Sequence, residues 1–148
     1  MIHLLPRRSL LAIAAVVDIA YHARPQPIAA KALAARHGLP PRHLETLLQV
    51  LVRSGILKGV RGPRGGYELA RERRKISIAD IVRAASSAAA GDEEETSVLV
   101  RNVVMPAIAS AADVFLERLQ QITVDDLCRE TQGQGIFVAS APGYDFTI

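Results

Sequence analysis

The feature that most constrains the fold of this sequence is a stretch rich in glycine and proline at residues 61–66. These six residues hold three glycines and a proline, so they do not form a helix. The segments on either side, residues 56–60 and 67–70, have the β-branched and alternating residues typical of short strands. The sequence therefore predicts a β-hairpin with a glycine-rich tip.

Three helices are expected ahead of this hairpin. Apolar residues at helical spacing predict a first helix beginning near Arg8, a second over residues 28–37 ended by Gly38, and a third over residues 41–54. The second and third helices are separated by a short turn, which is the outline of a helix-turn-helix, and the hairpin that follows is its wing. We therefore expect a mainly α fold with a small β-hairpin wing, that is, a winged helix-turn-helix.

A second helical region is expected after the hairpin. Ser77 and Asp80 have the spacing of a capping box and predict a helix that ends near Ala85. Residues 86–95 are first small and then acidic, which is typical of a flexible linker. From residue 96 to residue 121, apolar residues recur at alternating steps of four and three, so we expect a long helix that pairs with another helix, most simply from a second copy of the chain.

The end of the chain is less regular. Pro106 lies inside the long helical pattern and is expected to kink the helix or to mark its true start. Thr123 is expected to cap a further short helix that runs to Arg129. The remaining tail is glycine-rich, with a strand-like segment at residues 136–138.

Charge divides the chain into two unlike halves. Residues 1–75 hold 14 lysines and arginines against four acids, a net charge of +10, whereas residues 76–148 hold four arginines against 11 acids, a net charge of −7. Such a division is typical of a module that binds a polyanion joined to a region that does not, with nucleic acid the leading partner and an anionic membrane surface second. We therefore expect a DNA-binding domain (1–85), an acidic linker (86–95), a dimerisation helix with a short following helix (96–131) and a tail (132–148).

Candidate DNA contacts lie on the third helix and on the hairpin. The leucines of the third helix occupy one side and leave a polar set of the kind that reads base edges in the major groove, while arginines on the hairpin can enter a minor groove. The alternatives are an ordinary solvated helix face and a hairpin whose glycines serve only its turn, and the basic charge favours nucleic acid. The candidate residues are Arg42, His43, Glu45, Thr46, Gln49, Arg53, Lys58, Arg61 and Arg64.

Other classes of function have little support in the sequence. The four histidines are scattered and no catalytic or phosphate-loop motif is present, so we expect no enzyme. The longest strictly apolar run near the start has eight residues, whereas spanning a bilayer takes about 20, so no membrane span is expected. A single cysteine, Cys128, closes no internal disulfide and alone holds no zinc or iron-sulfur cluster. We therefore expect a cytoplasmic protein with no metal and no cofactor.

Several segments match a known family of proteins. The most specific is VRGPRGGYELA at residues 60–70, followed by ISIADIVRA at residues 76–84, and weaker matches lie at residues 17–20 and 121–127. With these segments the chain resembles the Rrf2 family of bacterial winged-helix transcription regulators over roughly residues 8–130. The resemblance implies a homodimer through residues of about 96–122 that binds a partly palindromic operator, and we expect it to act as a repressor.

The resemblance also assigns roles to individual residues. Glu45 matches a base-contacting glutamate and Arg61 matches the wing arginine directed at the minor groove, whereas Arg42 and His43 depart from the residues common in the family. Members that carry an iron-sulfur cluster hold it with three cysteines and a further ligand such as histidine. Residues 86–105 of this chain contain neither cysteine nor histidine, and Met105 stands at the histidine position, so we expect no cluster.

The effector and the class of partner stay open at this point. The resemblance allows a small-molecule effector between the dimerisation helix and the DNA-binding domain, a partner protein, or no effector. The rival interpretation is a winged-helix adaptor that binds another protein instead of DNA, because a fold does not by itself settle function. The two arginines of the hairpin and the charge of the basic half favour DNA.

Overall fold

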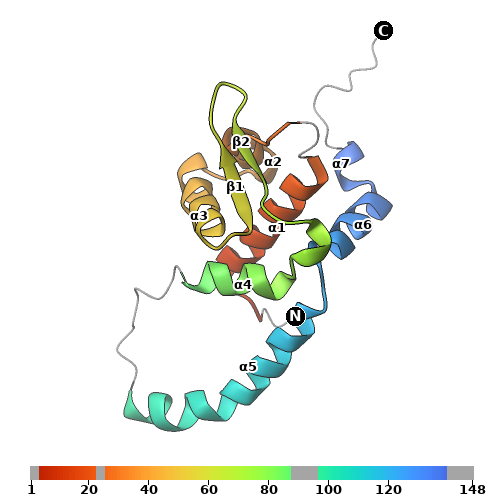
Figure 1. Ribbon diagram of the computed structural model, residues 1–148. Helices are drawn as coiled ribbons and strands as arrows, with labels where there is room; N and C mark the ends of the chain where they lie inside the picture. Colours follow the sequence, from red (N-terminus) through yellow and green to blue (C-terminus); the bar gives the residue numbers. More distant parts are fainter. Residues whose placement is uncertain (1–3, 23–25, 88–96, 140–148) are drawn as a thin grey trace.

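The computed structural model describes residues 4–22, 26–87 and 97–139 (Figure 1). Most of this part of the chain is helical, and its one sheet is a two-stranded antiparallel hairpin. The elements are α1 (Arg7–His22), α2 (Ala30–His37), α3 (Pro41–Arg53), β1 (Leu57–Val60), β2 (Gly66–Leu69), the 3₁₀ turn η1 (Arg73–Lys75), α4 (Ile78–Ser87), the π-helical turn η2 (Val100–Val104), α5 (Met105–Gln120), α6 (Val124–Gln134) and α7 (Ile136–Ala139).

The first four helices and the hairpin form a winged-helix body around one apolar core. Ile19 of α1, Leu48 and Leu51 of α3, and Ile81 of α4 are all fully buried there, and Leu57 closes the core at the base of the hairpin. On the other side of α1, α6 adds buried side chains of its own to the same core. The predicted fold, mainly α with a β-hairpin wing, is confirmed.

The β1–β2 hairpin, which we call the wing, is tied to the helix-turn-helix through the segment that precedes α2. Its register pairs Leu57 with Leu69 and Val60 with Gly66. The backbone N–H of Tyr67 donates to the carbonyl of Ile28 at 2.8 Å, and that of Ile28 donates to the carbonyl of Tyr67 at 2.9 Å. A Cβ on Gly66 would lie 2.3 Å from the carbonyl oxygen of Ile28, so this close approach requires glycine.

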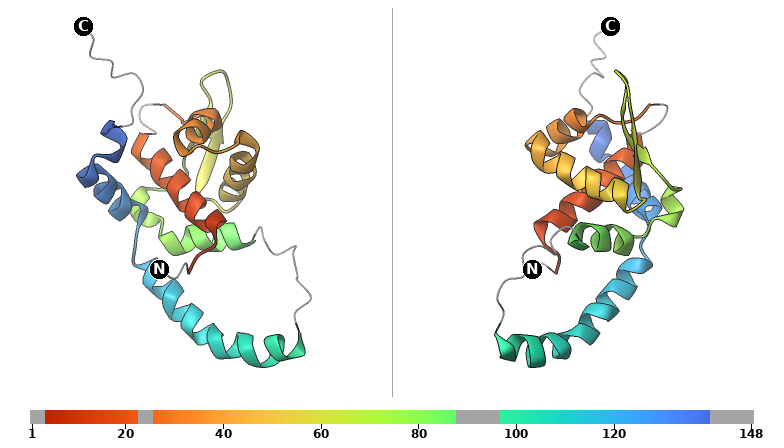
Figure 2. Two further views of the ribbon diagram at one scale, coloured as in Figure 1. Left: turned by 180° about the vertical axis from the view of Figure 1, so that it is seen from behind. Right: turned by 60° about the vertical axis from the view of Figure 1, so that its left-hand side comes forward.

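The long helix α5 leaves the body and extends away from it, as both views in Figure 2 show. Pro106 lies in its first turn and the π-helical turn η2 comes directly before it, so the proline marks the start of α5, one of the two outcomes predicted for it. The last third of α5 returns to the body, where Leu119 is buried and Phe115 is half-buried. The first half of the helix is exposed.

Two capping boxes of the same kind lie next to each other, one at the start of α4 and one at the start of α6. Ser77 and Asp80 exchange the two hydrogen bonds of a capping box at the start of α4, and Thr123 and Asp126 do the same at the start of α6. Ser77 and Thr123 form an antiparallel bridge, flanked by a 2.8 Å bond from the backbone N–H of Ile78 to the carbonyl of Ile122. Both predicted caps are confirmed.

The structure corrects the prediction for the end of the chain. The strand-like segment 136–138 lies within the short helix α7, so the prediction of a strand was wrong. Gly135 ends α6 in the left-handed conformation, and α7 then places the ring of Phe137 against those of Tyr21 and His22, a tertiary contact that outweighs local strand propensity. Residues 86 and 87 of the expected linker belong to α4, whereas residues 88–95 of the linker and 140–148 of the tail lie outside the described residues.

Candidate nucleic-acid interface

The third helix presents a polar face to solvent over its whole length. Pro41 starts the helix, where its missing N–H has no intrahelical role. The leucines Leu44, Leu48 and Leu51 are buried in the body. The polar side chains point the other way, and all six predicted contacts on α3 are exposed: Arg42, His43, Glu45, Thr46, Gln49 and Arg53. Their hydrogen-bonding groups are therefore available to a second molecule.

The wing carries two exposed arginines at its tip, which projects beyond the helices of the body (Figure 1). Gly62 has a φ of +113°, a conformation that only glycine adopts readily, and its carbonyl accepts a 2.9 Å hydrogen bond from the N–H of Gly65. This tight turn holds Arg61 and Arg64 on a narrow loop. Such a loop can enter a groove that is too narrow for a helix.

Lys58, the third candidate on the hairpin, lies at its base rather than at its tip. Its Nζ is 2.9 Å from a carboxylate oxygen of Glu68, the residue directly opposite on β2. Both side chains line a pocket next to the end of α1. The structure therefore separates Lys58 from Arg61 and Arg64, although the sequence grouped the three together.

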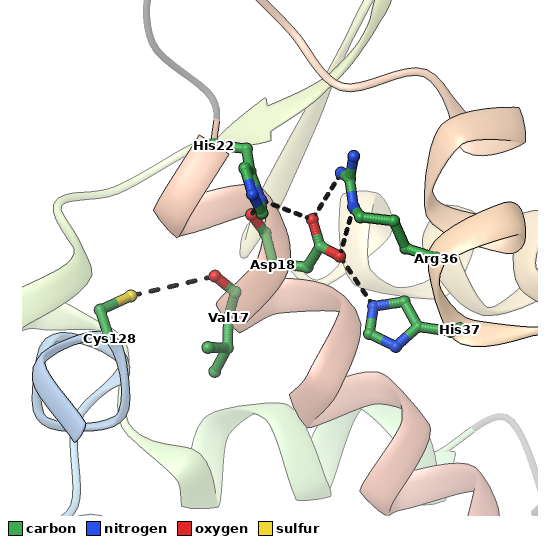
Figure 3. Close-up of polar contacts among 6 residues, drawn as sticks. All are labelled: Val17, Asp18, His22, Arg36, His37 and Cys128. Atoms are coloured by element: carbon green, nitrogen blue, oxygen red, sulfur yellow. Dashed lines mark hydrogen bonds and ion pairs between the residues drawn. The ribbon is translucent and has the colours of Figure 1, made fainter. Parts of the chain in front are cut away.

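A buried carboxylate that sequence reasoning missed fixes the helix-turn-helix against α1 (Figure 3). Asp18 is fully buried. The guanidinium of Arg36 donates to it twice, at 2.6 and 2.9 Å, and the rings of His22 and His37 lie 2.9 and 2.8 Å from its oxygens. Since Arg36 and His37 belong to α2, this cluster ties α2 to α1.

The environment of Asp18 keeps it ionised. Burial alone would raise its pKa, but the hydrogen bonds from His37 and Arg36 and the charge of Arg36 outweigh burial and lower the pKa to about 2. The signal in the sequence was an acid inside an apolar run of the first helix, which needs a partner if that face is buried. The partners Arg36 and His37 could not be named because they lie 18 and 19 residues away.

A helix-turn-helix with an exposed polar face, beside a wing with a cationic tip, defines a winged-helix regulator of transcription. The sequence model of one family, described as Rrf2, iron-dependent transcriptional regulator, matches residues 5–130. The chain belongs to the Rrf2 family.

Individual relatives agree with this assignment. The chain is 32% identical to the protein rrf2 of Nitratidesulfovibrio vulgaris over 120 residues, which cover 78% of this chain and 80% of that protein. It is also 32% identical to a putative HTH-type transcriptional regulator, slr0846, of Synechocystis over 143 residues, covering 89% and 96% of the two chains. The family and the slr0846 protein are described as regulators of transcription, a role that is not enzymatic.

Solved structures show the same fold. The structure of IscR from T. potens superimposes with a TM-score of 0.70 at 30% identity, covering 95% of this chain and 93% of that one. The structure of CymR from B. subtilis superimposes with a TM-score of 0.65 at 24% identity, over 88% and 99% of the two chains. The second likeness concerns the fold alone.

The description of the family names iron, but the donor residues of this chain do not fit an iron-sulfur cluster. Such clusters are held by several cysteine thiolates, and the sequence has one cysteine. Cys128 is buried, and its Sγ lies 3.9 Å from the carbonyl oxygen of Val17 (Figure 3). Burial raises the pKa of this thiol, which opposes ligation. Within the three described ranges, no group of three or more histidine, cysteine, aspartate or glutamate residues is placed to hold a metal ion.

The hydropathy of the helices bears on the expected lack of a membrane span. Among the residues that the structure describes, no helix combines the length and the apolar character needed to cross a bilayer.

Proposed function

We propose that this protein is a sequence-specific DNA-binding repressor that acts as a homodimer on a palindromic operator and without an iron-sulfur cluster. The observation that carries the proposal is the exposed polar face of α3 beside the exposed Arg61 and Arg64 of the wing. In this arrangement one helix enters a major groove while the wing tip reaches the adjacent minor groove. The charge of +10 over residues 1–75 adds contacts to phosphates that do not depend on sequence.

Three side chains of α3 have the chemistry to read base edges. Arg42 can donate to the two acceptors of guanine, Gln49 can pair with adenine, and Glu45 can accept a hydrogen bond from the amino group of cytosine. Among the residues that the structure describes, none is bonded to the side chain of Glu45 or Gln49, and both side chains are exposed and available to DNA. The wing arginine Arg61 is attracted by the negative potential of a narrow minor groove.

The proposed dimer rests on the first half of the long helix. Met105 and Ile108 of α5 are each more than half exposed, and Val98, Leu99 and Val104 continue the apolar surface toward the start of the helical region. A soluble monomer rarely exposes so many large apolar side chains together. A second copy of α5 would cover them, and twofold symmetry would place two α3 helices on half-sites about 34 to 36 Å apart or a multiple of this distance.

The donor set supports the proposed absence of a cluster, and control of the repressor is then left to another ligand. A bound repressor excludes the polymerase from its promoter by occupying the operator, which needs no chemistry from the protein itself. Release then requires an effector that binds the free and DNA-bound conformations unequally. The effector is a small molecule or a partner protein.

The proposal is tested by selecting bound fragments of the source genome with the purified protein and with the Arg61→Ala variant. We expect the wild type to enrich a shared palindromic motif and Arg61→Ala to lose about tenfold in affinity for it, with a smaller loss on random DNA. Arg118→Ala, on the exposed side of α5, is the matched control and should enrich the same motif as the wild type. Salt-sensitive binding without any motif, equal in the wild type and Arg61→Ala, would contradict the proposal and favour an adaptor that binds protein.

A further inference from the structure

A pocket of about 700 Å³ lies at the base of the wing, on the side that faces the end of α1. Its walls come from Tyr21 of α1, from the paired strands of the wing, and from residues 70–74, which lead into η1. Neither the polar residues of α3 nor the two arginines of the wing tip line it. The pocket is therefore separate from the surface that we assign to bases, and its volume is typical of sites for small molecules, about 300 to 1,000 Å³.

The lining of this pocket has an excess of positive charge. Lys58, Arg71, Arg73 and Arg74 contribute four cations, against two acids from the hairpin and the turn after it, Glu68 and Glu72. Guanidinium groups pair with the oxygens of carboxylates and phosphates through parallel hydrogen bonds. The charge of the lining thus selects an anion.

Three of the four cations, Lys58, Arg73 and Arg74, differ in how far they are already paired with acids. Lys58 is 2.9 Å from Glu68, and the Nε of Arg73 is 2.7 Å from Asp125, a buried acid at the start of α6. Arg74 Nε lies 3.8 Å from the second oxygen of Asp125, beyond hydrogen-bond distance, and its side chain is 82% exposed. Arg74 can therefore turn its donors to a ligand at little cost, whereas Arg73 would divide its donors between the ligand and Asp125.

The remaining wall of the pocket is apolar. It is formed by Ala20, Leu69, Ala70 and the ring of Tyr21. The ring of Tyr21 is held in place, because its centroid lies 4.9 Å from that of Phe137 on α7 and 5.1 Å from that of His22. A ligand that fits both walls is a small organic molecule with one or more anionic oxygens at one end.

We propose that this pocket binds a small organic oxyanion, held by Arg74 and Arg73, and that this anion is the effector of the protein. The effect on DNA rests on the proposed function, whereas the binding itself does not. An anion bound to Arg73 competes with Asp125 for the guanidinium of Arg73. Asp125 is ion-paired both with Arg73 and with Arg129 of its own helix. The same pocket is walled by the wing, so its occupation links the position of the wing to the contact between η1 and α6.

Binding is tested first without DNA, on the full chain, by calorimetry with citrate as a carboxylate probe and pyrophosphate as a phosphate probe. Each titration is matched in ionic strength by sodium chloride, so that general screening does not count as binding. We expect saturable binding of at least one probe and a loss of about tenfold in affinity in Arg74→Ala, the value of one charge-assisted hydrogen bond. The stronger probe identifies the preferred oxyanion.

Two further variants sharpen this test. Glu72→Gln removes a negative charge from the exposed rim of the pocket and should tighten binding, whereas Arg118→Ala, on α5 and outside the lining of the pocket, should leave it unchanged. Both positions are exposed, so the fold is retained. If neither probe binds saturably, or if Arg74→Ala binds as tightly as the wild type, the pocket is not an anion site.

The second arm measures affinity for the selected DNA fragment with and without the stronger probe. We expect the probe to change the affinity of the wild type and to leave that of Arg74→Ala unchanged. No change in the wild type would overturn the assignment as effector. If Arg74→Ala weakens DNA binding without any probe as much as Arg61→Ala does, the pocket belongs to the DNA contact surface and the proposal fails. A protein that binds the probe through Arg74 but binds no DNA would support the pocket and refute the proposed function.

Discussion

The winged-helix body and the long helix α5 are built from the same kinds of apolar residue at the same helical spacing, yet they end in opposite environments. In the body, Ile19 and Leu48 are fully buried. On the first half of α5, Met105 and Ile108 are 51% and 59% exposed. The difference lies in whether the chain itself supplies an opposing surface. The body completes its own core, whereas the first half of α5 has no opposing surface among the residues that the structure describes.

The boundary between buried and exposed apolar surface lies within α5 itself. The predicted apolar stripe is continuous in the sequence, but Phe115, Leu119 and Ile122 at its end pack on the body while Val104 and Ile108 stay exposed. One helix therefore serves the fold at one end and, under the proposed function, an interface at the other. Mutations can test this comparison, because a residue of one region can be changed without altering the other region.

The largest expected effect comes from placing a charge on the exposed half of α5. In a symmetric dimer, Ile108→Asp removes two buried isoleucines, each worth about 1.5 to 3 kcal/mol, and buries two carboxylates. We expect the dissociation constant of the dimer to rise by more than about a hundredfold, measured by light scattering and sedimentation. The unfolding of the body should be unchanged.

The control for this variant lies two residues further along the same helix. Ser110 is exposed on the side of α5 away from Ile108, so Ser110→Asp adds the same charge outside the apolar stripe and should leave the dimer intact. If Ile108→Asp and Ser110→Asp behave alike, the exposed stripe is not the dimer interface, and the contrast between the two regions loses its functional meaning.

The matching disturbance of the body is Asp18→Asn. This change leaves the guanidinium of Arg36 without its charged partner in a largely buried position, which costs about 3 kcal/mol for an ion pair of this kind. Denaturant unfolding should show this loss as a lower midpoint with an unchanged slope. Asp113→Asn on exposed α5 is the control and should change stability by less than about 0.5 kcal/mol. Equal stability of the two variants would show that the Asp18 cluster does not hold the body together.

Acid should weaken the body through the same residue. The pKa of Asp18 is about 2 in the folded chain and near 3.8 without its partners, so the folded state favours the ionised carboxylate. The resulting stabilisation, about 2 kcal/mol, is complete above pH 4 and is lost as the pH falls from about 4 to about 2. Unfolding curves at a series of pH values should show this loss in the wild type and a smaller one in Asp18→Asn. A loss of the same size in both proteins would assign the effect to other carboxylates.

The body could be predicted from the sequence because its signals are local. The spacing of leucines in α3, the glycines of residues 61–66 and the capping pairs at Ser77 and Thr123 each report on the few residues around them. All of these elements formed where the sequence predicted them. The six candidate contacts on α3 could likewise be named as solvent-facing, because burial of the apolar side of α3 leaves its polar side exposed.

What could not be predicted depends on residues that are distant along the chain. Two of the three partners of Asp18, Arg36 and His37, come from a different helix, and the pocket is assembled from α1, the wing and η1. The strand expected at residues 136–138 was wrong for the same reason, since the contact of Phe137 with Tyr21 joins positions more than 100 residues apart. Local sequence patterns do not indicate which distant residues will be in contact in the folded chain.

The smallest expected effect belongs to Lys58, and it tests whether the base of the wing differs from its tip. Lys58 is paired with Glu68, so part of its positive charge is already neutralised and it attracts a phosphate less strongly. Arg61 at the tip is exposed, and its whole guanidinium is available to a groove. Lys58→Ala should therefore weaken binding about twofold to threefold, equally on operator and random DNA. The slope of log affinity against log salt concentration should fall by less than the value of one phosphate contact. Affinities measured on both DNAs over a series of salt concentrations decide this. A loss as large as that of Arg61→Ala, or one confined to the operator, would show that the wing reads DNA along its whole length rather than at its tip.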